Sequence, residues 1–256
     1  MLQLEDKVAL IVGGSSGIGE AIARRFGKEG ASVAVVSSSS VEKAEAVVAS
    51  IRSIGGTGRP YVANVREMSS LEALARDVAS DFGGIDILVN SAGVYFPTRL
   101  GETRPDDIHR MVDVNLIGTM LAIEAVAPYL KARGGGSIIN LSSVAAYVGS
   151  KDYPLYCATK AAVKMLTRAM ALQLAPLGIN INAIAPGNTA TPMNEHIRTQ
   201  PEFAQRRTLI DATTPSRRKF SDPDDMASAA LFLASGQGRA MHGATMLLDE
   251  GRAAGW

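Results

Sequence analysis

The chain has 256 residues, of which 46% are hydrophobic and 20% are charged, and its formal net charge is +1. This size and composition are typical of a single globular α/β domain with one core. The balanced charge argues against nucleic acid and anionic membranes as partners, because such partners require a surplus of Lys and Arg on one face.

Short apolar runs alternate with longer amphipathic segments from one end of the chain to the other. The apolar runs predict buried strands over 7–12, 33–36, 59–63, 85–89, 137–141, 179–184 and 244–248. Apolar residues at helical spacing predict helices over 17–28, 41–54, 69–82, 105–131, 155–174 and 223–234. Strict alternation implies right-handed crossovers and a parallel sheet with helices on both faces. The expected fold is α/β, a doubly wound Rossmann-type sheet of about seven strands, in one domain over residues 1–256.

Two of the predicted helices begin with capping signals. Ser39 with Glu42 three residues later predicts a capping box for the helix that starts at 41. Thr103 is the expected N-cap of the longest helix, with Pro105 in its first turn.

The one long irregular stretch covers 187–222. Loops of this length inside a compact domain are usually functional or mobile, so we expect a mobile substrate lid with some helix of its own. The basic runs within it, Arg206-Arg207 and 217–219, are interpreted as solvated loop charge.

A glycine-rich turn follows the first strand. Its sequence is Gly13-Gly14-Ser15-Ser16-Gly17-Ile18-Gly19. Small residues allow the backbone to turn sharply and to approach a pyrophosphate, and the start of the next helix offers free N–H groups to the anion. The turn predicts a dinucleotide site.

A candidate catalytic group lies between the fifth strand and the helix after it. Tyr156 and Lys160 are four residues apart, which brings their side chains together on one helix face. A nearby ammonium group lowers the pKa of a phenol toward the range in which it serves as a general acid or base. Ser143 follows the fifth strand, at the sheet edge where ligands bind, and its hydroxyl can hydrogen-bond a carbonyl oxygen.

The glycine spacing together with Ser143, Tyr156 and Lys160 resembles the classical short-chain dehydrogenase/reductase family over essentially the whole chain. The resemblance implies an enzyme that moves a hydride between a nicotinamide ring and a small ketone or secondary alcohol, with Tyr156 as the general acid/base. It implies that Lys160 also binds the nicotinamide ribose. It further implies that Asn115, a polar residue in an apolar helical stretch, holds a water beside Lys160 in a proton relay.

The end of the second strand bears on the choice of coenzyme. The family's acidic position, which binds the 2′-hydroxyl of NAD, is occupied here by Ser37, followed by Ser38. No acid is present there to repel a 2′-phosphate and serines can hydrogen-bond one, so NADP(H) is favoured over NAD(H). Arg59 would contribute only if the fold brought it close.

Other segments resemble the family's cofactor-binding turns with single changes. Val12 stands where the family has Thr, Ser91 where it has Asn, Thr189 where it has Val or Ile, and Glu250 where it has Gly. The predicted cofactor-binding residues are Gly13, Ser15, Ser16, Gly17, Ile18, Gly19, Ser37, Ser38, Asn64, Val65, Asn90, Ala92, Gly93, Tyr156, Lys160, Pro186, Gly187, Thr189 and Thr191.

Two other functions share these motifs. One is a 3-oxoacyl-[acyl-carrier-protein] reductase, and the other is a non-catalytic dinucleotide-binding sensor that kept the fold. The Tyr-to-Lys spacing argues against an enoyl reductase, whose relatives in the family use a longer gap. Aromatic residues in the loops predict a partly apolar substrate pocket, and no charge constellation in these loops points to one compound.

The remaining expectations concern partners and location. The single cysteine, Cys157, excludes an intrachain disulfide and fits a reducing compartment. No signal peptide is recognised and no stretch has the length of a membrane span, so a cytoplasmic protein without membrane or nucleic-acid partners is expected. The histidines show no metal-ligand spacing. The resemblance implies a homo-oligomer, in particular a homotetramer, with the tail that ends in Trp256 near a neighbour's pocket.

Overall fold

The computed structural model describes residues 2–255 and contains one seven-stranded parallel sheet in the order β3-β2-β1-β4-β5-β6-β7. The strands are β1 (Val8–Val12), β2 (Ser32–Ser37), β3 (Thr57–Val62), β4 (Ile87–Asn90), β5 (Gly136–Leu141), β6 (Ile179–Pro186) and β7 (Thr245–Leu248). The predicted doubly wound parallel sheet is confirmed, and the strand ends differ from the expected ones by only a few residues.

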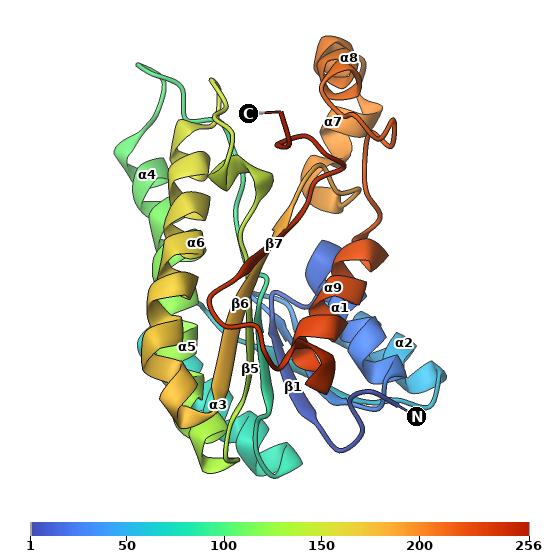
Figure 1. Cartoon of the computed structure of the whole chain (residues 1–256), viewed down its shortest axis with the longest axis vertical. Helices are drawn as coiled ribbons and strands as arrows, with labels where there is room; N and C mark the ends of the chain where they lie inside the picture. The colour runs from blue at the N-terminus through green and yellow to red at the C-terminus, as the bar shows by residue number, and fades with distance from the viewer. Residues whose placement is uncertain (1, 256) are drawn as a thin grey trace.

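Helices cover both faces of this sheet (Figure 1). One face is packed by α1 (Gly17–Lys28), α2 (Val41–Ser53) and α9 (Pro223–Ala234). The other face is packed by α3 (Met68–Phe82), α5 (Gly118–Ala132) and α6 (Pro154–Leu174).

The side chains of β1 alternate between the two apolar clusters on the opposite faces of the sheet. Ala9 and Ile11 belong to the apolar cluster under α1, α2 and α9, whereas Val8, Leu10 and Val12 belong to the cluster under α3, α5 and α6. Successive side chains of a strand point to opposite faces, so a strand covered on both faces is apolar throughout. This is why the buried strands appear in the sequence as continuous apolar runs.

The longest predicted helix is interrupted. Helix α4 (Pro105–Val112) is joined to α5 by a π-helical turn over Asp113–Ile117, and Asn115 is the buried residue of that turn. π-Helical turns inside α-helices occur frequently at functional sites, and they have no simple sequence signal.

Both predicted N-caps are wrong by one residue. Ser40, not Ser39, caps α2 by accepting a hydrogen bond from the Lys43 backbone N–H. Arg104 occupies the N-cap position of α4, and the Thr103 hydroxyl donates to the Arg99 carbonyl instead. Neighbouring Ser and Thr residues compete for such positions, and the path of the preceding chain decides between them.

The region 187–222 carries two short helices, α7 (Glu195–Thr199) and α8 (Ala204–Ala212). They project beyond the carboxyl edge of the sheet, and the segment after β7 runs to the same edge (Figure 1). The expected helical content of this region is confirmed. The expected placement of Trp256 lies outside the described residues.

The helical run Pro105–Ala132 corrects one expectation, because it is long and apolar enough by length and composition to cross a membrane. Its apolar side chains Ala122, Ile123, Val126 and Leu130 are buried against the sheet and neighbouring helices. A core helix of a globular fold passes the same test.

Candidate active site

A cavity of about 550 Å³ runs along the carboxyl ends of the strands, from β2 to β6. The sheet order reverses between β1 and β4, because β2 and β3 extend the sheet on one side of β1 and the crossover after β3 leads to β4 on the other side. In open α/β sheets, ligands bind at this switch point. The helices α7 and α8 contribute Ile197, Arg206 and Ile210 to the cavity wall. The site is therefore built from loops on one edge, held by a rigid sheet.

The glycine turn after β1 is a backbone cradle at this edge. Gly13 has a φ of +81°, and a Cβ on it would lie 2.5 Å from the Ala92 backbone nitrogen. A Cβ on Gly19 would overlap the Gly13 carbonyl oxygen. Ser16 occupies the N-cap of α1 without a side-chain hydrogen bond to the helix. The first N–H groups of α1 thus carry no side-chain cap beside the cavity, which suits a phosphate.

The missing Thr at Val12 is replaced by main-chain hydrogen bonds. The Gly14 N–H donates to the carbonyls of Ile11, at 3.1 Å, and Val36, at 3.0 Å. The turn is therefore closed without a side-chain hydroxyl.

Seventeen of the predicted cofactor residues line the cavity, and Gly19 and Asn90 do not. The Asn90 side-chain amide donates to Asn140 Oδ1 at 2.9 Å inside the sheet. Gly19 packs behind Gly13. Both residues support the cavity wall from behind, which sequence position alone does not reveal.

The end of β2 presents two serines to the cavity. Ser37 is 3% exposed, and its hydroxyl accepts a hydrogen bond from the Ser40 backbone N–H, while Ser38 is exposed. Arg59 forms an ion pair with Asp81 at 2.8 Å and is absent from the cavity lining. Arg59 is therefore no helper for a 2′-phosphate.

Thr189 gives a direct test of whether a dinucleotide fits. It is 4% exposed and lines the cavity, and its hydroxyl has no hydrogen-bond partner among the residues that the structure describes. Buried hydroxyls normally have partners. A polar group such as a carboxamide, bound in this part of the cavity, would supply one, so the residues present fit the cofactor that the sequence predicts.

Tyr156 and Ser143 meet in the cavity wall. Burial raises the pKa of the Tyr156 phenol to about 12, and a hydrogen bond with Ser143 partly offsets this rise. The Ser143 hydroxyl also accepts the Ala145 N–H at 3.1 Å. In the protein alone, burial outweighs the lowering of this pKa that the spacing to Lys160 predicts, and the phenol is protonated at neutral pH.

Lys160 lies beside them and is buried. Its Nζ is 5.7 Å from the Tyr156 ring centre and donates to the Leu141 carbonyl at 2.7 Å. Burial lowers the Lys160 pKa to about 8. The Ser142 hydroxyl donates to the Lys160 carbonyl at 2.9 Å and so holds this turn of α6 against the end of β5.

Asn115 fixes the loop after β4. Its Oδ1 accepts the Val94 N–H at 2.8 Å, and its Nδ2 donates to the Val94 carbonyl at 3.0 Å. A Cβ on Gly93 would lie 3.4 Å from Asn115 Oδ1 and 3.7 Å from Lys160 Nζ. The structure thus brings Asn115 next to Lys160, with Gly93 between them.

The far wall of the cavity combines aromatic loop residues, which the sequence predicted for the substrate pocket, with an arginine that it did not predict there. Tyr95 stacks on Tyr153 with ring centres 4.3 Å apart and contacts the Tyr156 ring edge-on at 4.8 Å. Arg206 Nη2 donates to the Tyr95 hydroxyl at 2.7 Å, and Nη1 donates to the Tyr153 hydroxyl at 2.9 Å. The interpretation of Arg206 as solvated loop charge is therefore wrong.

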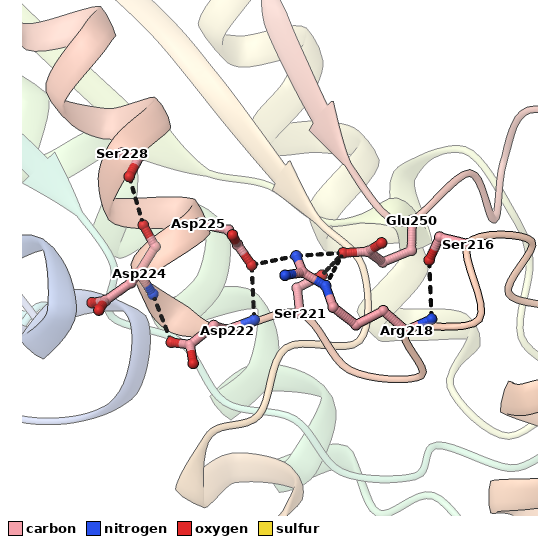
Figure 2. A network of polar contacts seen from close by, with 8 residues as sticks. All are labelled: Ser216, Arg218, Ser221, Asp222, Asp224, Asp225, Ser228 and Glu250. Atoms are coloured by element: carbon pink, nitrogen blue, oxygen red, sulfur yellow. Dashed lines mark hydrogen bonds and ion pairs between the residues drawn. The ribbon is translucent and has the colours of Figure 1, made fainter.

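A second arginine, Arg252, lines the same cavity from the segment after β7. Figure 2 shows how that segment is held: Arg218 lies between Asp225 at the start of α9 and Glu250 after β7. Arg218 Nε donates to Glu250 Oε1 at 2.8 Å. No motif in the sequence signals Arg206 or Arg252, because the fold alone brings them together.

Replacing Lys160 with methionine is expected to remove a pH-dependent part of the stability of the cofactor-free protein. A lysine pKa of about 8 in the folded state and about 10.4 in the unfolded state means that the unfolded chain binds more protons between these values. Lys160 therefore contributes a rise of about 2 kcal/mol to the free energy of unfolding between pH 8 and pH 10. Denaturation in urea at both pH values measures this rise.

The comparison that isolates Lys160 is with Lys131→Met, which removes an exposed lysine. The rise should be about 2 kcal/mol smaller in Lys160→Met than in Lys131→Met. Equal rises in the two variants would contradict a depressed Lys160 pKa.

The chain is similar to known proteins over nearly its whole length. A family model described as "Enoyl-(Acyl carrier protein) reductase" matches residues 12–253. A 2,5-dichloro-2,5-cyclohexadiene-1,4-diol dehydrogenase, LinX, of Sphingobium indicum is 36% identical over 253 residues, which is 99% of this chain and 98% of that protein. The 3-oxoacyl-[acyl-carrier-protein] reductase FabG of Thermotoga maritima is 35% identical, covering 98% of this chain and 99% of that protein.

Solved structures agree in fold. A gluconate 5-dehydrogenase of Burkholderia cenocepacia in complex with NADP and tartrate superposes with a TM-score of 0.92 at 34% identity, covering 99% of this chain and 97% of that one. A 7α-hydroxysteroid dehydrogenase in complex with NADH and 7-oxo glycochenodeoxycholic acid gives a TM-score of 0.91 at 33% identity, covering 98% and 95%.

Proposed function

The chain belongs to the short-chain dehydrogenase/reductase family, and we propose that Tyr156 is the general acid/base of its reaction. It is an NAD(P)-dependent oxidoreductase that transfers a hydride between nicotinamide and a carbonyl/alcohol pair. The observation that carries the proposal is that Ser143, Tyr156 and the buried Lys160 line one wall of the cavity, with Lys160 Nζ 5.7 Å from the Tyr156 ring centre.

The roles of the chain's own groups follow from their positions. The bound coenzyme supplies or accepts the hydride. The glycine turn and the uncapped start of α1 would hold its phosphates, and Thr189 would bind its carboxamide. Ser143 hydrogen-bonds the substrate oxygen. Tyr156, protonated at neutral pH, donates a proton to that oxygen during carbonyl reduction. Alcohol oxidation requires the phenolate, so that direction gains from higher pH.

Lys160 and Asn115 complete the proposed site. The Lys160 ammonium binds the nicotinamide ribose, and its pKa of about 8 leaves it able to pass protons near neutral pH. Asn115, held in the π-helical turn, keeps the loop at Val94 in place beside Lys160 and supports the relay toward solvent.

Carbonyl reduction is favoured over reduction of a carbon–carbon double bond. The matching family model carries an enoyl reductase description, but Tyr156 and Lys160 stand four residues apart on α6. The relatives reported above include dehydrogenases of a diol and of a steroid alcohol. A 3-oxoacyl-[acyl-carrier-protein] reductase remains the second candidate, because FabG of Thermotoga maritima is matched over nearly its whole length.

The experiment that tests the proposal follows loss of nicotinamide absorbance with ketones, diketones, keto sugars and a 3-oxoacyl thioester, using NADPH and NADH in parallel. Turnover of a ketone is expected. Turnover of the thioester alone would favour the acyl-carrier reductase. Tight coenzyme binding without turnover of any carbonyl or alcohol would favour the sensor and contradict the proposal.

We propose that NADP(H) is the preferred coenzyme. Ser37 and Ser38 offer hydroxyls at the end of β2, and no Asp or Glu is among the described residues of the cavity wall. Structural relatives bind either NADP or NADH, so the coenzyme preference is argued from the residues of this chain and not from the shared fold.

Replacing the exposed Ser38 with arginine is expected to lower the Kd for NADPH about tenfold relative to that for NADH, because a guanidinium group pairs well with phosphate. The matched control is Ser39→Arg, which adds the same charge one residue away and outside the cavity lining. Coenzyme titrations followed by fluorescence measure both ratios. An equal shift in the two variants would place the 2′-phosphate elsewhere.

We further propose a cytoplasmic homotetramer that uses the outer faces of α5 and α6, with region 187–222 closing over substrate. Large apolar side chains are exposed on α6, with Met165 60% and Leu172 81% exposed, and Ile117, just before α5, is 43% exposed. Light scattering of the purified protein measures the mass.

A further inference from the structure

The cavity is lined by basic side chains without acidic ones. Among the described residues, its wall includes Lys160 and the arginines 66, 110, 206 and 252, and no Asp or Glu. Part of this charge suits the phosphates of a dinucleotide. Arg206 and Arg252, however, lie with Tyr95 on the substrate side, away from the glycine turn.

These two guanidinium groups lie close enough to repel each other. Burial lowers the pKa of Arg252, and the charge of Arg206 lowers it further. Neither arginine forms an ion pair within the described residues. Two partly buried like charges without an acidic partner are costly in free energy unless an anion joins them.

The two carboxylates near these arginines, those of Asp249 and Asp152, have other hydrogen-bond partners. Asp249, which attracts Arg252 from nearby, accepts the backbone N–H groups of Gly251 and Ala253 at 3.0 and 2.7 Å. Asp152 is bound by Arg99 at 2.9 Å. Arg206 donates to tyrosine hydroxyls, which carry no charge to offset its own.

The Tyr95 side chain connects Arg206 to Tyr156, the proposed general acid/base. The Tyr95 ring contacts Tyr156 at its edge, and the Tyr95 hydroxyl accepts a hydrogen bond from Arg206. Arg252 lines the same cavity as Tyr95 and Tyr156. An anion bound by the two arginines would therefore lie within the length of a small molecule from the Tyr156 hydroxyl.

The backbone is strained at Glu250, two residues before Arg252. Glu250 has a φ of +60°, an uncommon conformation for a residue with a side chain, and the family's usual residue there is glycine. Its carboxylate accepts hydrogen bonds from Arg218 Nε and from the Ser221 hydroxyl, the latter at 2.9 Å (Figure 2). These hydrogen bonds fix the segment that carries Arg252, two residues after Glu250.

We propose that the substrate of this enzyme carries a carboxylate, bound by Arg206 and Arg252, a few atoms from the carbon that is oxidised or reduced. Guanidinium groups recognise carboxylates by paired hydrogen bonds, and the tyrosine wall supplies the apolar contact for the chain between. The proposal rests on the proposed oxidoreductase function, since it assigns the substrate class of the same site.

Matched substrate pairs test the proposal. The ketones 3-oxobutanoate, 4-oxopentanoate and 5-oxohexanoate are each compared with their methyl esters, and dihydroxyacetone phosphate is compared with dihydroxyacetone. We expect at least one acid to exceed its ester at least tenfold in kcat/KM. In Arg252→Met this ratio should fall to near one through loss of activity on the acid, with activity on the ester retained. Arg239→Met, which removes an exposed arginine outside the cavity wall, should keep the ratio.

A binding measurement removes the dependence on turnover. Calorimetric titration of coenzyme-loaded protein with succinate and glutarate, and with the corresponding diamides, should detect a dicarboxylate that binds at least tenfold more tightly than its diamide. Arg252→Met and Arg206→Met should each abolish this difference. The coenzyme Kd of each variant, measured alongside, shows that the fold is intact.

The outcomes separate the two proposals. Turnover of neutral ketones with no preference for acids overturns the carboxylate site and leaves the oxidoreductase function in place. Arg252-dependent binding of dicarboxylates without turnover of any substrate supports the carboxylate site and contradicts the reaction. A preference for the phosphate pair alone, or an acid preference that survives in Arg252→Met, overturns the assignment.

Discussion

Tyr156→Phe is expected to reduce kcat by at least about a thousandfold, because it removes the proton donor while leaving the ring in place. Coenzyme binding should change little, because the substitution removes only one hydroxyl and leaves the glycine turn and Lys160 unaltered. Stopped-flow absorbance at saturating coenzyme and substrate measures kcat, and fluorescence titration measures the coenzyme Kd.

The matched control is Tyr61→Phe. Tyr61 is a phenol outside the cavity wall whose hydroxyl donates to Asp81 at 2.6 Å. Loss of the Tyr61 hydroxyl should leave kcat within about a factor of two of that of the unmodified enzyme. Turnover that survives in Tyr156→Phe would show that another group protonates the substrate, and the mechanism proposed above would be wrong.

Gly19→Ala is expected to abolish coenzyme binding, with a Kd at least about a hundredfold higher, and to lower the free energy of unfolding by about 2–3 kcal/mol. A Cβ at this position would overlap the Gly13 carbonyl oxygen, and backbone cannot move aside as a flexible side chain can. Relief requires displacement of the whole turn, and with it the start of α1 that faces the phosphates.

Gly236→Ala provides the control for a single added methyl group. A Cβ on Gly236 meets nothing within 4 Å, and its φ is not in the left-handed region. Urea denaturation and coenzyme titration of both variants separate a general effect of alanine from the specific overlap. Normal coenzyme binding by Gly19→Ala would mean that the turn has room to rearrange and that its close packing is unnecessary for binding.

The resemblance identified in the sequence rests on local patterns, and these patterns survive in the structure. Buried parallel strands are continuous apolar runs because both faces of the sheet are covered, so their positions are visible without coordinates. Tyr156 and Lys160 share a helix face because four residues make about one turn. The glycine turn is recognisable because its contacts leave no room for a side chain at Gly13 and Gly19.

Details of the site that depend on packing were not predictable in this way. Asn90 is a member of a recognised motif, yet its side chain turns into the sheet to meet Asn140, a residue fifty positions later. The phenol of Tyr156 has a raised pKa because of burial, which a spacing of residues cannot express. The π-helical turn at Asn115 leaves the helical pattern of the sequence unchanged.

Periodicity and contacts between residues near in the chain were therefore enough to predict the fold, the edge of the sheet that carries the cavity, and the grouping of Ser143, Tyr156 and Lys160. The charge of the cavity wall beside Tyr95 depends instead on tertiary packing. Arg206 comes from α8 and Arg252 from the segment after β7, and both line one cavity because β6 and β7 are neighbours in the sheet and the segments that follow them reach the same edge. Pairing across such a distance in sequence costs chain entropy that only the packed fold offsets, so no local pattern records it.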